Sequence, residues 1–134
     1  MPKIYVYDAY SNKMITYNLG ENDTMPYTYG TTMKVKEFRG SSQSPTLWTT
    51  TAAMEAWNLT RRSYGKGIHI GYAFKRIWEG GHGTRSQHYA GVAFDVGQGQ
   101  GSSARNAIWR AAKNTGAWGY VEPPDMAPPW VHFD

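Results

Sequence analysis

The segment SQHYAGVAFD, residues 86–95, decides the fold together with WVHFD, residues 130–134. Side chains of a strand alternate between its two faces, so apolar residues at every second position enter the core and the residues between them face outward. Both segments alternate in this way, the first of them over residues 91–96. We therefore predict two neighbouring strands that bury their valines and phenylalanines and present Asp95 and His132 side by side on the outer face.

A third polar side chain, His88, lies in the loop before the first of these strands, seven residues before Asp95. Catalytic zinc takes three histidine or carboxylate ligands and keeps a fourth position open for water or substrate. His88, Asp95 and His132 meet that count, and two imidazoles with one carboxylate suit zinc. A surface or structural role explains any one histidine alone equally well. The joint pattern predicts a zinc site.

The two segments resemble the zinc D-Ala-D-Ala carboxypeptidases and related peptidoglycan peptidases, which share their fold with the Hedgehog signalling domain. The family pattern is Ser-x-His-x-x-Gly-x-Ala-x-Asp, followed much later by a strand that carries the third ligand histidine. This sequence matches it at Ser86, His88, Gly91, Ala93, Asp95 and His132. An apolar helix, a short strand and a Gly-Tyr pair of the family also resemble residues 47–64, residues 67–70 and Gly71-Tyr72. The resemblance implies a Hedgehog/DD-peptidase-like α+β fold, a small antiparallel sheet with packed helices, over about residues 34–134.

The resemblance also implies a hydrolase that cleaves amide bonds involving D-amino acids in the stem or cross-bridge peptides of bacterial peptidoglycan, as a carboxypeptidase or as an endopeptidase such as a lysin. Such a reaction needs a group that takes a proton from water and passes one to the leaving amine. Many family members carry Asp or Glu three residues before the last ligand, where this chain has Pro129. We predict Glu122 as the base, with Asp125 and Glu79 as alternatives.

Further residues of the predicted site lie in the segment before His88. His82 stands six residues before His88, a spacing that the Hedgehog-like branch shares, and we predict that it donates to the oxyanion or to a substrate carboxylate. Family members often carry an Arg directly after the Gly-Tyr pair, where this chain has Ala73. Arg76 or Lys75 would replace that charge. The predicted substrate-binding residues are Arg76, Ser86 and Gln87. Ordinary loop and turn roles explain these side chains as well.

Local patterns predict the remaining elements. Residues 3–8 and 14–19 are rich in β-branched and aromatic side chains and predict a hairpin. We assign it to an N-terminal extension, residues 1–33, packed on the same domain as the peptidase part, residues 34–134.

Helix signals frame two further segments. Ser44-Pro45 predicts the start of a helix that runs to about residue 64 and is closed by Gly65. A second helix is expected from Ser102 or Ser103 to Gly116, and residues 67–74 are expected to form a central strand. The elements do not alternate strictly as βαβ units, which favours an α+β arrangement.

Composition limits the function further. The chain of 134 residues suffices for one domain, and the absence of cysteine excludes a thiol nucleophile and disulfides. It shows no secretory signal and no run of eighteen apolar residues, so we expect no membrane insertion. We expect a monomer outside the cell or in the cell wall, reached by a route that the sequence does not show. The alternative is a longer chain that also carries a wall-binding domain.

The net charge of +4 is spread along the chain rather than clustered. Scattered basic residues suit an anionic cell wall, whereas nucleic-acid binding is typical of clustered ones, and we expect no nucleic-acid partner. Three hypotheses remain: a zinc peptidase, a non-catalytic metal-stabilised wall-binding domain of the same fold, and a basic interaction module without metal. A carboxylate near the metal would separate the first two.

Overall fold

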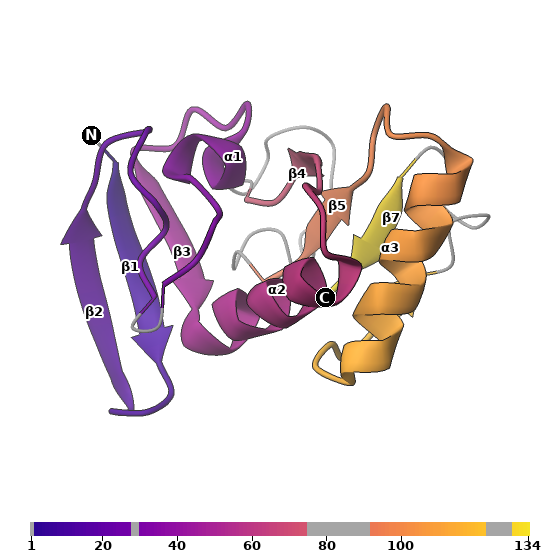
Figure 1. Ribbon diagram of the computed structural model, residues 1–134. Coiled ribbons are helices and arrows are strands. Elements are labelled where there is room, and N and C mark those ends of the chain that lie inside the picture. Colours follow the sequence, from indigo (N-terminus) through magenta and orange to yellow (C-terminus); the bar gives the residue numbers. More distant parts are fainter. Residues whose placement is uncertain (1, 28–29, 75–91, 123–129) are drawn as a thin grey trace.

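The computed structural model describes residues 2–27, 30–74, 92–122 and 130–134. These residues form a small mixed α+β fold with two sheets and three helices (Figure 1). The elements in chain order are β1 (Lys3–Asp8), β2 (Lys13–Asn18), α1 (Val35–Arg39), β3 (Thr46–Thr50), α2 (Thr51–Tyr64), β4 (Ile70–Tyr72), β5 (Phe94–Val96), α3 (Ser102–Thr115), β6 (Val121–Glu122) and β7 (Val131–Phe133). None of the helices in the described residues is long and apolar enough to cross a membrane.

The first sheet has the strand order β2-β1-β3. Strands β1 and β2 pair antiparallel, which confirms the predicted hairpin with its second strand one residue earlier than expected. Strand β3 lies parallel to β1 on the other side. The inner face of this sheet buries Ile4, Val6 and Leu47 in a core cluster that also contains Phe94 and Phe133 of the second sheet.

Strand β3 corrects the prediction of a helix that begins at Ser44-Pro45. The segment TLWTT is rich in β-branched and aromatic residues, which favour a strand, and β1 offers it a pairing edge. The Ser44 hydroxyl donates to the carbonyl oxygen of Thr46 at 2.6 Å, so it stabilises the turn before β3 instead of capping a helix. The N-cap of α2 is Thr50, whose Oγ1 accepts from the Ala53 amide at 3.0 Å.

The second sheet has the order β4-β5-β7-β6 and is antiparallel throughout. The prediction of one small antiparallel sheet therefore fits only this part of the fold, because the N-terminal hairpin pairs with β3 to make a separate sheet. The central strand expected over residues 67–74 is shortened to β4, and in the described residues it lies at one edge of this sheet rather than at its centre. Gly71 of β4 packs closely on Gln98: a Cβ at this position would lie 2.2 Å from Nε2 of that side chain. A larger residue at Gly71 would require Gln98 to move.

Helices α2 and α3 pack against each other (Figure 1). Helix α2 contacts β1 and β3 of the first sheet, and α3 contacts β6 and β7 of the second. The Trp57 ring of α2 lies 5.6 Å from the Phe94 ring of β5, centroid to centroid, and both side chains are fully or almost fully buried. Gly65 and Gly116 end the two helices in left-handed conformations, which confirms both predicted helix ends. The apolar face of the sheet thus points toward the helices, and its other face is left for polar residues.

Candidate metal centre

The polar face of the second sheet brings Asp95 and His132 together. Asp95 of β5 stands directly opposite His132 of β7, as the alternation in the sequence predicts. Oδ1 of Asp95 lies 2.6 Å from Nδ1 of His132, and the two side chains are 12% and 20% exposed. Their neighbours along the strands, Phe94 and Phe133, are fully buried on the opposite face, so packing fixes which way the polar pair points.

Asp134 is a third member of this cluster. Its Oδ2 lies 2.9 Å from Nε2 of His132, on the opposite side of the ring from Asp95. Residues two apart in an extended segment share a face, and the sequence alternation already placed these two side chains together. The sequence pattern does not assign Asp134 a role, because a contact between ring and carboxylate depends on side-chain geometry. The structure makes Asp134 the residue that orients the imidazole.

Glu122 extends the polar row to the next strand. It stands opposite His132 in the pairing of β6 with β7, so Asp95, His132 and Glu122 occupy one row across three strands. Directly opposed residues in an antiparallel pair have Cβ atoms about 4.5–5.5 Å apart and share a face. Glu122 is half-buried. The Glu122 and His132 side chains therefore leave the sheet on the same face, from Cβ atoms about 5 Å apart.

The two carboxylates change the protonation of the imidazole. The hydrogen bond with Asp95, and to a lesser extent that with Asp134, raises the pKa of His132 from 6.5 to about 9, against the opposing effect of burial. In the metal-free protein at neutral pH, the ring is thus a cation that donates from both nitrogens. A metal that binds one of these nitrogens must displace its proton, so metal binding and protonation compete at His132.

The metal-free protein should lose stability as the pH rises from about 6.5 to about 9. Because the folded pKa of His132 is raised, its contribution is full below the unfolded pKa near 6.5 and disappears above the folded value of about 9. We expect the melting temperature in the presence of a chelator to fall by on the order of 5 °C across this window. Calorimetry at a series of pH values measures it, with His132→Gln as the control that should show a much flatter profile. A melting temperature that rises across the window would contradict the assigned ion pairs.

Asp95 and His132 could supply two of the three protein ligands that catalytic zinc uses. Nδ1 of His132 and Oδ1 of Asp95 converge in a poorly exposed place, and both are ordinary zinc donors. When Nδ1 binds a metal, Nε2–H is free to donate to Asp134, an arrangement that fixes the ring of many metal-bound histidines. Among the described residues, no group of three or more His, Asp or Glu side chains is arranged to hold a metal ion.

The other predicted site residues lie outside the described part of the chain. These are the third ligand His88, the predicted oxyanion donor His82, the substrate-binding Arg76, Ser86 and Gln87, and the alternative bases Glu79 and Asp125, together with Pro129. Their placement relative to Asp95 and His132 therefore stays a prediction from the sequence.

Comparisons of the chain with family models, with curated proteins and with solved structures found no match.

Proposed function

We propose that this protein is a zinc-dependent peptidase that cleaves amide bonds involving D-amino acids in bacterial peptidoglycan, with a Hedgehog/DD-peptidase-like fold and a place of action at the cell wall. The observation that carries the proposal is the contact of 2.6 Å between Asp95 and His132. These two residues are 37 positions apart in the sequence and meet as the ligand pattern of the resembled family requires. Glu122 adds a further carboxylate on the next strand.

His88, Asp95 and His132 would hold the metal in this proposal, and Asp134 would fix the orientation of the His132 ring. When bound, zinc supplies a Lewis acid that polarises a carbonyl group and lowers the pKa of water. The low exposure of Asp95 and His132 strengthens electrostatic interactions at this place relative to bulk water.

Glu122 is the residue that we assign to proton transfer. Its position opposite His132 on the neighbouring strand supports this assignment. In hydrolysis it would accept a proton as water attacks the carbonyl carbon, and it would return that proton to the amine as the bond between carbon and nitrogen breaks. His82 would donate to the oxyanion, and Arg76, Ser86 and Gln87 would bind the peptide.

Glu122→Gln should lower turnover on peptidoglycan peptides by on the order of a hundredfold while zinc stays bound. Glutamine keeps the shape of the side chain and removes the group that takes the proton. Turnover is measured by chromatography of released fragments, and zinc by elemental analysis of the same sample. Unchanged turnover would transfer the role to Asp125 or Glu79.

The second candidate is a non-catalytic wall-binding domain stabilised by metal. It is favoured by Pro129, which stands where many members of the resembled family carry an acidic residue. This candidate predicts that zinc-loaded protein binds peptidoglycan and leaves its peptides intact, and that Glu122→Gln changes neither property.

A further inference from the structure

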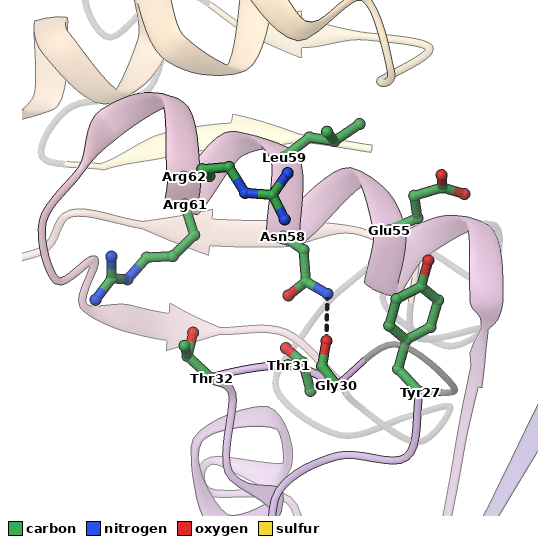
Figure 2. A pocket seen from close by; sticks show the side chains of 9 residues that line it. All are labelled: Tyr27, Gly30, Thr31, Thr32, Glu55, Asn58, Leu59, Arg61 and Arg62. Carbon is green, nitrogen blue, oxygen red and sulfur yellow. Dashed lines mark hydrogen bonds between the residues drawn. The ribbon is translucent and has the colours of Figure 1, made fainter.

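A groove of about 560 Å³ lies on the outer side of α2, formed with Tyr27 and residues 30–32 (Figure 2). Nδ2 of Asn58 donates to the carbonyl oxygen of Gly30 at 2.8 Å and ties this segment to the helix. The groove residues of α2 are Glu55, Asn58, Leu59, Arg61 and Arg62. Four of them follow the spacing i, i+3, i+4, i+7 that makes one helical face. The buried face of α2, with Met54 and Trp57, points the other way.

One end of this groove is cationic. Arg61 and Arg62 lie in the last turn of α2, and in the described part of the chain neither guanidinium has an ion-pair partner. Consecutive helical residues point about 100° apart, because a turn takes 3.6 residues. The two guanidinium groups accordingly diverge in Figure 2. They suit two separate carboxylates better than a single anion held between them.

The other end of the groove is anionic. The carboxylate of Glu55 accepts a hydrogen bond from the Tyr10 hydroxyl at 3.1 Å. A tyrosine hydroxyl is a donor at neutral pH, and hydrogen bonding with Tyr27 raises the pKa of Tyr10 further above its ordinary value. Glu55 and Arg62 are seven residues apart, which along a helix is about 10 Å. An extended peptide covers that distance with about three residues.

We infer that the groove binds a short peptide about three residues long, with its free amine at Glu55 and two carboxylates at Arg61 and Arg62. The charge pattern carries this inference, since the opposite ends of such a peptide meet opposite charges of the groove. Leu59, which is 37% exposed between those ends, offers apolar contact to a middle side chain. The groove is lined by none of the residues assigned to metal or proton transfer, so it is a separate site.

The probe is the tripeptide Ala-Ala-Glu, which has a free amine at one end and two carboxylates at the other. We expect nuclear magnetic resonance titration to give a dissociation constant on the order of 1 mM or tighter. Arg62→Gln and Arg61→Gln should each weaken binding at least fivefold, and acetylation of the peptide amine should weaken it by a similar factor. Arg110→Gln, which removes an exposed arginine of α3 outside the groove, should change nothing.

A double-mutant cycle assigns the orientation. In Glu55→Gln, the free and acetylated peptides should bind equally, because the group that distinguishes them is gone. Equal binding of the two peptides by the unchanged protein would overturn the inference. So would an absence of resonance shifts at about 10 mM peptide, which is tenfold above the weakest expected dissociation constant. Asp95→Ala should retain full peptide binding, which separates this site from the proposed zinc site.

Discussion

Replacing His132 or Asp95 by alanine should each remove most of the bound zinc and, with it, any peptidase activity. Each substitution deletes one of three proposed ligands, and Nδ1 of His132 and Oδ1 of Asp95 lie 2.6 Å apart. The remaining protein ligands cannot complete the three-ligand set that catalytic zinc uses. Elemental analysis after dialysis against a weak chelator measures the zinc content, and circular dichroism checks that the variants are folded.

Asp134→Asn supplies a graded control for this prediction. Asparagine keeps the size of the side chain but weakens the hydrogen bond to Nε2 of His132. Loss of such an outer partner weakens metal binding about 10–100-fold without deleting a ligand. The expected order of zinc affinity is therefore the unchanged protein, then Asp134→Asn, then Asp95→Ala and His132→Ala. If the alanine variants bind zinc as tightly as the unchanged protein, Asp95 and His132 are not its ligands.

Phe94→Ala should be the most destabilising single change in the described core, by about 3–5 kcal/mol. The Phe94 ring is fully buried and lies 5.5–6.4 Å, centroid to centroid, from four other rings; these belong to Phe38, Trp57, Trp118 and Phe133. Truncation removes apolar contact and leaves a cavity between the sheet and α2. Since whole domains are stable by only about 5–15 kcal/mol, this loss is a large fraction of the total. Urea titration of the purified variant measures it.

Met14→Ala is the matched control, because this side chain of β2 is 53% exposed. We expect its effect to stay within about 0.5 kcal/mol. Phe94→Leu should cost clearly less than Phe94→Ala, since it refills part of the volume. A loss below about 1 kcal/mol for Phe94→Ala would mean that the aromatic cluster does not hold the second sheet against α2.

The meeting of Asp95 and His132 could be predicted from the sequence because strand alternation is a strong local signal. The alternation in FDV and VHF puts four apolar side chains in the core, those of Phe94, Val96, Val131 and Phe133, all fully buried. Asp95 and His132, which lie between them, therefore share the opposite face. The hairpin and both helix ends were predictable for a similar reason, since turns and left-handed glycines have characteristic residues.

Other parts of the fold depend on tertiary contacts that the sequence does not show. Ser44-Pro45 is a good helix start by local criteria. The segment TLWTT nevertheless forms β3, because it pairs in parallel with β1, whose residues come 43 positions earlier in the sequence. The role of Asp134 depends on the direction of the His132 ring, and the groove on α2 depends on the segment that Asn58 holds through Gly30. Pairing partners and ring orientations are set by the whole chain, so neither follows from a local pattern.

The most direct test of the proposed function is mass spectrometry of purified peptidoglycan peptides after incubation with the zinc-loaded protein. We predict new fragments that correspond to hydrolysis of one amide bond next to a D-amino acid, and their loss in a variant that lacks His88, Asp95 and His132 together. Peptides that stay intact with the fully zinc-loaded protein, or the same cleavage by the triple variant, would contradict the assignment of a zinc peptidase.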